Sequence, residues 1–508
     1  MKKAVILLMV LTIVSKVSGF LRDLTLAYFY GASEISDVFL LAISIPTIVF
    51  GVIAAGISTG YIPLYSRIEN KLGERAGIEY TNNLINVLMV LTTVLVALAL
   101  IFTEYLVKIF AIGFEGETLA LAVMFTRFSI FGVYFTIIIR ILSAYLNYKK
   151  VFAVPSLIGI PMNLVLIAAI AISSRTEWIY VLAMANVVAL FIQFLIIVVA
   201  AYRYAFRFQA VFQPKDRHIK EMAALAFPVI LGSSVSQINR LVDRSLASWI
   251  SVGGISSLNY ANTMNTAFLG IFVSSFVTVF YPDISRKAAK GDMEGLKYTM
   301  NQTIIGVLLL IIPVTAGALA FAEPIVRFLF GRGAFDETAV TLTTSAFFFY
   351  SIGLIGTGVN LILTRVFYAL QDTKSPMINS AIGMGINVGL NFALAPLLGI
   401  GGLALATSIS ALITVILLTQ GLRRKLGRLN LTKLVPSTLK IVMAAGVSTL
   451  IALMLYGAAE SVLGMNISLV IALSVMVLLY FSAVYLLKIE GADIFIKGIM
   501  RRFKRKRN

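Results

Sequence analysis

The chain has 508 residues, of which 59% are hydrophobic and 13% charged, and its formal net charge is +19. A soluble domain is nearer half apolar and about a quarter charged, so this composition excludes an ordinary soluble protein. With no cysteine and a single histidine, His218, a disulfide framework and a Cys/His metal site are excluded, and no cofactor is expected. Nucleic acid is not an expected partner, because the Lys and Arg residues lie mainly in short loops between apolar segments.

Apolar runs of about 20 residues recur along the whole chain and predict about fourteen transmembrane helices. The first run follows Met1-Lys2-Lys3 and is too long for the core of a typical signal peptide, so we expect an uncleaved first helix. The predicted spans are residues 4–29, 35–63, 82–103, 119–147, 153–173, 178–202, 221–250, 256–284, 299–321, 338–368, 377–395, 401–421, 434–457 and 464–487.

Alternate loops differ sharply in basicity, which fixes the predicted orientation. The positive-inside rule puts the basic loops and both chain termini in the cytoplasm. Trp178 and Trp249 then fall at outward helix ends, as interfacial anchors do. The tail is expected to be a topology signal, with anionic membrane lipids as a second possible contact. The basic segments are residues 2–3, 67–75, 149–150, 203–220, 286–297, 374, 423–433 and 501–507.

The two halves of the sequence align with each other. The pattern S-x-V-S-x-x-x-R occurs at Ser15–Arg22 and again at Ser233–Arg240. Glu104, Val107 and Lys108 likewise correspond to Glu323, Val326 and Arg327, at an offset of about 219 residues. One offset holds about six predicted helices, and an even number makes the halves parallel repeats related by an axis along the membrane normal.

The predicted fold is therefore an all-α polytopic membrane protein with two parallel six-helix lobes and two further C-terminal helices. The expected N-terminal lobe spans residues 1–215 and the C-terminal lobe residues 216–430. Residues 431–508 hold the last two helices and the basic tail. Such repeats are typical of transporters, in which the substrate path runs between two lobes.

Several ionisable residues fall inside predicted spans, where each costs several kcal/mol, roughly 3 or more, unless it has a partner or a water-filled cavity. One interpretation is a hydrated cationic cavity for an anionic head group, because the guanidinium fork suits phosphate. The alternative is structural: ion pairs, a carboxylate at a helix start, or a cluster that locks the lobes. Arg140 and Arg365 are expected to snorkel to the interface instead. The candidate residues are Lys16, Arg22, Asp23, Asp37, Arg240, Asp243 and Arg244.

Several motifs resemble the MurJ (MviN) family, the lipid II flippases of the MOP superfamily. Ser15–Asp23 is similar to the family's S-R-x-x-G-F-x-R-D opening, and Phe29–Phe39 to its F-G-A-…-D-A-F segment. In the second half, Val242-Asp243-Arg244, Leu258–Asn262 and Ala322–Arg327 are similar as well. The resemblance covers roughly the first 430 residues and the family also has fourteen helices.

This resemblance implies export of the undecaprenyl-diphosphate-linked peptidoglycan precursor, lipid II, by alternating access across the bacterial cytoplasmic membrane. It implies a transporter and no enzyme, with Arg22, Asp23 and Asp37 as matching cavity residues. The substrate is then a lipid-linked sugar diphosphate, and the cell-wall synthesis machinery is a further candidate partner. Lys16 stands where the family usually has arginine, which keeps the charge and loses the fork.

Two departures concern cavity cations. The family typically has a basic residue after the proline equivalent to Pro46, where this chain has Phe50-Gly51. A cavity arginine usually follows Tyr260-Ala261-Asn262, where this chain has Thr263. Arg240 is an additional cation in a neighbouring helix and is the candidate replacement.

Three alternative functions stay open. The nearest is a flippase for another polyprenyl-linked glycan, such as an exopolysaccharide or teichoic acid unit. A multidrug antiporter of the MATE type needs carboxylates for organic cations, and the arginine excess in the spans disfavours it. A membrane-embedded glycosyltransferase is disfavoured by the short outward loops, which lack room for a catalytic domain.

Overall fold

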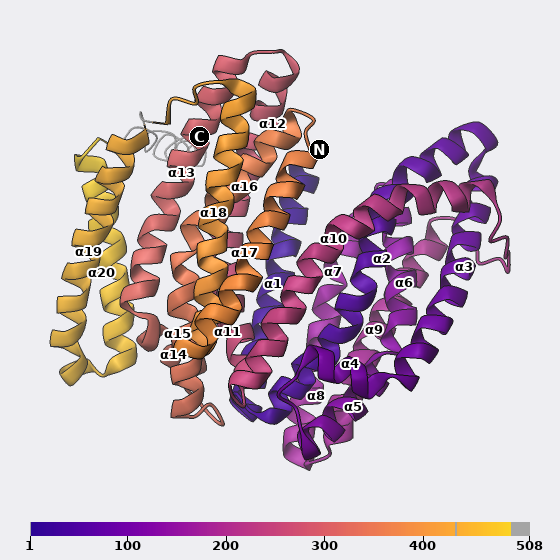
Figure 1. Ribbon diagram of the computed structural model, residues 1–508, viewed down its shortest axis with the longest axis horizontal. Coiled ribbons are helices and arrows are strands. Elements are labelled where there is room, and N and C mark those ends of the chain that lie inside the picture. Colours follow the sequence, from indigo (N-terminus) through magenta and orange to yellow (C-terminus); the bar gives the residue numbers. More distant parts are fainter. Residues whose placement is uncertain (1, 432–433, 489–508) are drawn as a thin grey trace. The chain divides into compact units, whose positions relative to one another are not determined.

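A computed structural model describes residues 2–431 and 434–488 of the chain, and every regular element within these ranges is helical (Figure 1). This agrees with the predicted all-α class. Lys433 and the basic tail at 501–507, both named in the predicted topology, lie outside the described residues.

The packing of the helices divides the chain into two compact units. Unit 1 comprises Met1–Ser256 together with Arg332–Ala339, and unit 2 comprises Ser257–Gly331 and the chain from Val340 onward. The lobes predicted from the repeat meet at residues 215 and 216, whereas the boundary in the packing lies beyond the long helix α10 (Arg217–Ile250). The reason is that α10 packs along α2 (Glu34–Leu72) of the first repeat.

Unit 1 surrounds a core that is rich in tyrosine. Tyr61 and Tyr65 of α2 stack on each other with ring centroids 5.6 Å apart, and Tyr145 meets Tyr65 edge-on. The hydroxyl of Tyr61 lies 2.7 Å from that of Thr81. The remaining helices of this unit are α1 (Lys2–Tyr30), α3 (Glu74–Ile101), α4 (Thr103–Phe110), α5 (Gly116–Ser129), α6 (Gly132–Tyr148), α7 (Ala153–Leu157), α8 (Gly159–Thr176) and α9 (Ile179–Arg203).

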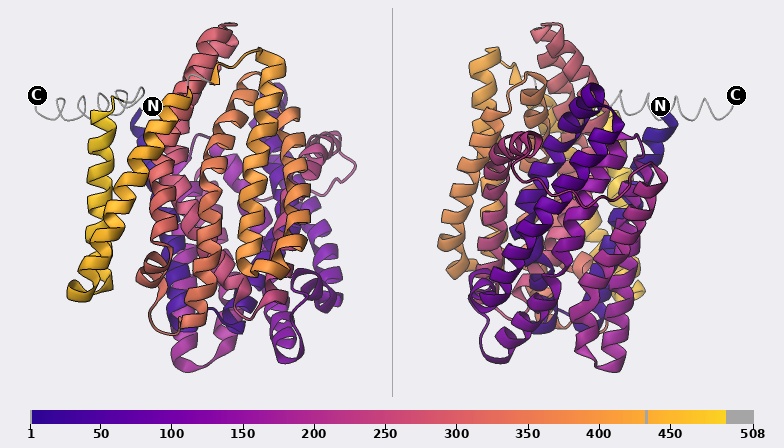
Figure 2. Two further views of the ribbon diagram at one scale, coloured as in Figure 1. Left: turned by 60° about the vertical axis from the view of Figure 1, so that its left-hand side comes forward. Right: turned by 90° about the vertical axis from the view of Figure 1, so that its right-hand side faces the viewer.

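Unit 2 is organised around α13 (Met293–Ala320), which is largely buried and packs against α12, α16 and α19. Tyr480 donates a hydrogen bond to the carbonyl of Leu309 at 2.7 Å and so ties the last helix to α13. Helices α19 and α20 stand side by side as the yellow pair in Figures 1 and 2. Its other elements, of which α11 and α15 begin in unit 1, are α11 (Gly254–Phe268), the π-helical segment Leu269–Ser274, α12 (Ser275–Ala289), α14 (Ala322–Phe330), α15 (Glu337–Ile352), α16 (Leu354–Ala369), α17 (Lys374–Leu398), α18 (Ile400–Leu426), α19 (Leu434–Leu463) and α20 (Met465–Leu486).

Helix lengths follow the internal repeat. Helices α3 to α6 have 28, 8, 14 and 17 residues, and α13 to α16 have 28, 9, 16 and 16. The pair α5–α6 is bent by 41° and the pair α15–α16 by 44°. The short helices α4 and α14 each carry an i,i+4 ion pair, Glu104–Lys108 and Glu323–Arg327. Both halves of the sequence therefore encode the same local structures.

Within the described residues, ten helical segments are long and apolar enough to span a membrane, and twelve if each bent pair counts as one span. The two other predicted spans, 4–29 and 256–284, correspond to α1 and to the α11–α12 segment. The chain is thus a polytopic membrane protein, and the number fourteen stays a prediction.

The turns at the ends of α1 and α10 bring repeat-related segments together within unit 1. The amide of Ala334 donates to the carbonyl of Tyr28 at 2.8 Å, and the amide of Gly113 donates to Ser248 Oγ at 3.1 Å. Gly31 has φ of +63°, and a β-carbon there would lie 2.3 Å from the carbonyl oxygen of Ala334. This position needs glycine for its left-handed backbone and for the close approach of the neighbouring chain.

Candidate functional site

A stripe of polar side chains runs along one face of α6. Thr136, Arg140, Ser143 and Asn147 are separated by four, three and four residues, which places them on a single helix face. All four line one cavity of about 800 Å³ inside unit 1. The helix is otherwise apolar, with Ile137, Ile141 and Leu142 among its buried residues, so the stripe is the polar wall of this cavity.

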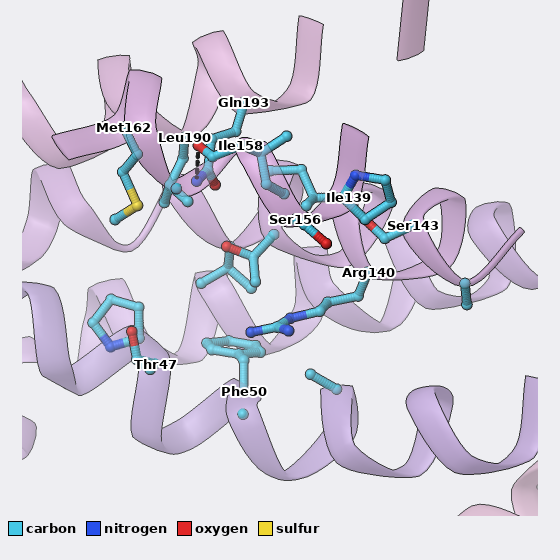
Figure 3. A pocket seen from close by; sticks show the side chains of 18 of the residues that line it. Thr47, Phe50, Ile139, Arg140, Ser143, Ser156, Ile158, Met162, Leu190 and Gln193 are labelled. Carbon is cyan, nitrogen blue, oxygen red and sulfur yellow. Dashed lines mark hydrogen bonds between the residues drawn. The ribbon is translucent and has the colours of Figure 1, made fainter. Parts of the chain in front are cut away.

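The opposite walls come from α2, α9 and the interrupted helix α7–α8. Pro46, Thr47 and Phe50 contribute from α2, and Asn186 and Gln193 from α9. The helix from Ala153 to Thr176 breaks at Ile158, three residues before Pro161, whose ring cannot sit above a continuous helical turn. Gln193 Nε2 donates to the carbonyl oxygen of Ile158 at 2.8 Å and satisfies the group that the break exposes (Figure 3).

Among the described residues that line the cavity, Arg140 is the sole charged one. Its side chain is exposed, and its guanidinium end extends toward the Phe50 ring across the cavity (Figure 3). The Ser143 hydroxyl, one turn further along α6, is buried and has no hydrogen-bond partner in the described part of the chain. The cavity therefore carries a net positive charge and an unused hydrogen-bonding group.

Sequence reasoning predicted that Arg140 snorkels to the membrane interface, which stays a prediction, and the structure shows that Arg140 lines this cavity. The prediction treated residues 119–147 as one span, near whose inner end Arg140 would fall. The break between α5 and α6 makes α6 a separate 17-residue helix, and Arg140 lies at its middle. The four-three-four spacing of polar residues was the available signal. Arg365, paired with it in that prediction, lies over the Tyr281 ring at 5.2 Å.

The predicted residues on α1 form a local ion pair. Arg22 Nη2 and Asp23 Oδ1 are 2.7 Å apart, and Arg22 Nε also donates to the same oxygen at 3.0 Å. The Arg22 side chain keeps 21% of its surface exposed, and the Asp23 side chain only 3%. Lys16 is exposed on the same helix. This arrangement orients the guanidinium and leaves part of the Arg22 side chain accessible.

Asp37 is buried and contacts the first turn of α11. Its Oδ1 accepts a hydrogen bond from the backbone N–H of Ser256 at 2.7 Å. A carboxylate at a helix N-terminus is stabilised by the free N–H groups and by the helix dipole. Asp37 itself follows the Ser33 capping box at the start of α2, so the carboxylate joins two helix starts.

The predicted residues of α10 each take part in a hydrogen bond. Arg240 is exposed and donates to Gln237 Oε1 at 2.6 Å. Asp243 Oδ2 accepts from Asn239 Nδ2 at 3.2 Å. Arg244 Nη1 donates to the backbone carbonyl of Leu40 at 3.0 Å, one turn along α2 from Asp37. Asp37 and Arg244 are thus brought to neighbouring turns of α2, whereas none of the seven predicted residues lines the Arg140 cavity.

The sequence has two positions at which a cavity cation typical of the resembled family is missing, and one of them lies in that cavity. Phe50 and Gly51, which stand where the resemblance expects a basic residue, both line it. The cavity nonetheless contains a cation, which α6 supplies in place of α2. Thr263 belongs to α11 and hydrogen-bonds through its carbonyl to Thr266 Oγ1 at 3.1 Å.

Comparisons with known proteins give a consistent result. The model of the family described as "Lipid II flippase MurJ" matches residues 26–485. A Vibrio cholerae protein named "Probable lipid II flippase MurJ" is 30% identical over 464 residues, which cover 88% of this chain and 87% of that protein.

Two solved structures have a similar fold. The structure titled "Lipid II flippase MurJ, inward closed conformation" superposes with a TM-score of 0.81 at 25% identity, over 97% of this chain and all of that one (100%). An inward-facing multidrug resistance MATE family transporter of the MOP superfamily superposes with a TM-score of 0.67 at 16% identity, over 83% of this chain and 94% of that one. The second similarity concerns the fold alone.

Proposed function

Because the chain belongs to the family of the lipid II flippase MurJ, we propose that it moves lipid II across the cytoplasmic membrane of a bacterium by alternating access. The observation that carries this proposal is the family match over residues 26–485, which includes helices of both units and the last pair α19–α20. The all-α architecture is that of the MOP superfamily, in which both solved relatives are transporters.

The charges within the spans support an anionic cargo. Arg22 is held by Asp23 with part of its side chain accessible, and no carboxylate among the described residues lines the unit 1 cavity beside Arg140. We infer that Lys16 and Arg22 contact the diphosphate and that Asp23 positions Arg22. We further infer that Arg240 and Asp243 belong to the same path, and that Asp37 and Arg244 hold the helices around it.

The proposal includes a location and a set of partners. We place both termini in the cytoplasm, on the basis of the basic loops. The substrate is a lipid-linked sugar diphosphate, and anionic lipids contact the basic segments. The cell-wall synthesis machinery is the expected source and consumer of the cargo. The protein acts as a transporter, so no bond of the cargo is made or broken.

A flippase for another polyprenyl-linked glycan is the second candidate. One observation favours this second candidate. The family's cavity is expected to carry a cation on α2, where this chain has Phe50-Gly51, whereas the cavity of this chain carries its cation, Arg140, on α6. The charge would therefore reach the cargo from a different side. A MATE-type antiporter for organic cations is disfavoured, because the described lining of the cavity includes an arginine and no carboxylate.

Reconstitution separates these candidates. Purified protein is placed in vesicles that contain fluorescent lipid II or a fluorescent teichoic-acid-type lipid, and the labelled lipid accessible to a membrane-impermeant quencher is measured over time. We expect transport of lipid II, and rescue of a strain depleted of its own lipid II flippase. Transport of the teichoic-acid-type lipid alone, with no rescue, would establish the second candidate. Protein-free vesicles provide the baseline.

A further inference from the structure

We propose that the Arg140 cavity of unit 1 is a binding site for a glycosyl phosphate, with the phosphate on Arg140 and the sugar hydroxyls on the surrounding neutral side chains. The site is separate from the seven charged residues identified in the sequence, none of which lines it. The inference rests on the proposed function only for the source of the ligand, namely the head group of the transported lipid.

The first argument is that the charge of Arg140 is not balanced by a carboxylate in the cavity. A cation within a membrane span requires water or an anion close by. Two other arginines of the spans have a partner: Arg22 pairs with Asp23 at 2.7 Å, and Arg365 lies over the Tyr281 ring at 5.2 Å. Among the described residues, no carboxylate lines the cavity around Arg140. The arginine is therefore available to an anion that enters from outside the chain.

The second argument is the chemistry around the guanidinium. Arginine binds phosphate with two parallel hydrogen bonds, and it stays charged when water is removed. One turn further along α6, Ser143 presents a buried hydroxyl without a partner, and Asn147 continues the same face. Ser156 lines the same cavity from the facing segment (Figure 3). These neutral side chains can donate hydrogen bonds to sugar hydroxyls and accept hydrogen bonds from them.

The third argument is size and shape. A volume of about 800 Å³ is within the usual range of roughly 300–1,000 Å³ for small-ligand sites. Phe50, which is only 3% exposed, forms an apolar part of the wall beside the guanidinium (Figure 3). A free inorganic phosphate would fill only part of this space, so the combination favours a phosphate joined to a sugar.

The test uses the full-length protein in detergent and measures binding by isothermal titration with two probes. One is N-acetylglucosamine 1-phosphate, and the other is a short-chain lipid-linked disaccharide diphosphate. We expect Arg140→Gln to weaken binding of the lipid-linked probe at least tenfold, and Arg140→Lys to weaken it less. Arg365→Gln, in which a cation is removed from the other unit, is expected to bind as the unaltered protein does. Equal binding by Arg140→Gln and the unaltered protein would overturn the proposal.

Competition experiments identify the source of the ligand, and a second variant tests the site without removing its charge. Competition by the soluble sugar phosphate would show that the head group alone is recognised, whereas competition by inorganic phosphate of equal strength would overturn the sugar part of the proposal. Ser143→Ala keeps the charge and is expected to weaken both probes by about threefold, and no change would remove Ser143 from the site. Failure to transport lipid II, with Arg140-dependent binding retained, would refute the proposed function and leave this inference standing.

Discussion

The carboxylate of Asp37 accepts a hydrogen bond from the backbone N–H of Ser256 at 2.7 Å, across a sequence separation of 219 residues. This separation equals the offset of the internal repeat, so equivalent helix starts of the two repeats meet at this point. Gly253, beside Ser256, has φ of +75°, and an added β-carbon would lie 2.2 Å from the carbonyl of Ala32. The start of α2 and the first turn of α11 are therefore tightly packed together.

We predict that Asp37→Ala destabilises the protein by about 1.5–3 kcal/mol, the usual cost of losing a hydrogen bond to a charged group. Asp37→Asn, which keeps an acceptor oxygen, should lose less. Chemical unfolding of the purified variants measures both effects. A substitution that leaves stability unchanged and abolishes transport would instead assign Asp37 to substrate contact.

Arg22→Ala is predicted to abolish lipid II transport at a normal level of protein in the membrane. The side chain is partly accessible, and its ion pair with Asp23 fixes the direction of the guanidinium. Arg22→Lys keeps the charge without the fork, so we expect intermediate transport. The vesicle assay gives the rate, and immunoblotting of membranes gives the level. Full activity of Arg22→Ala would disprove a role in the transport path.

Arg240→Ala is predicted to reduce transport as strongly as Arg22→Ala does. Its side chain is exposed and its recorded partner is the neutral Gln237, so its charge is not consumed by an acid in that contact. Gln237→Ala is the matched control, because it removes this partner and keeps the cation. A silent Arg240→Ala variant would show that this arginine does not replace the cation expected at Thr263.

The fold was largely predictable because hydropathy and charge are local signals. Apolar runs gave the positions of the helices, and the Glu104–Lys108 and Glu323–Arg327 pairs gave the equivalence of α4 and α14. The partner of Asp37 could not be read in this way, because the spacing of local residues carries no information on a contact between distant helix starts. The sequence predicted that Asp37 stabilises a helix start, but of its own helix α2. The structure shows that its carboxylate accepts a hydrogen bond from the first turn of α11.

The candidate cavity was missed for a related reason. A hydropathy window joins α5 and α6 into one span, since the break at Ile130 and Phe131 contains no polar residue or proline. The bend of 41° depends on packing, and the break makes α6 a separate helix with Arg140 at its middle. Whether a cation lines a cavity therefore depends on helix breaks and packing that hydropathy does not reveal.

Asp372 gives a prediction for acid pH. Partial burial works to raise its pKa, but hydrogen bonds from Lys425 and Ser375 outweigh this and lower the pKa of Asp372 from 3.8 to about 2. Its folded-state pKa is below the unfolded value, so its contribution to stability is complete above about pH 4 and is lost as pH falls toward 2. Thermal unfolding between pH 5 and 2 should show a loss that is smaller in Asp372→Asn. An identical pH dependence in both proteins would contradict the assignment.

The final prediction concerns the linker between α9 and α10. The side chains of three asparagines of α3 form hydrogen bonds with backbone groups of this linker. Asn82 accepts from the amide of Gln209 at 3.0 Å, and Asn83 both accepts from the amide of Gln213 at 2.7 Å and donates to its carbonyl at 3.0 Å. Asn86 donates to the carbonyl of Val211 at 2.8 Å. Each net hydrogen bond contributes about 1 kcal/mol, so Asn83→Ala should raise the hydrogen-exchange rate of the Gln213 amide about tenfold or more. Gln209→Ala keeps the backbone contacts and should leave that rate unchanged. Equal exchange in Asn83→Ala and the unaltered protein would mean that these side chains do not hold the linker, and that α10 is positioned by its packing on α2 alone.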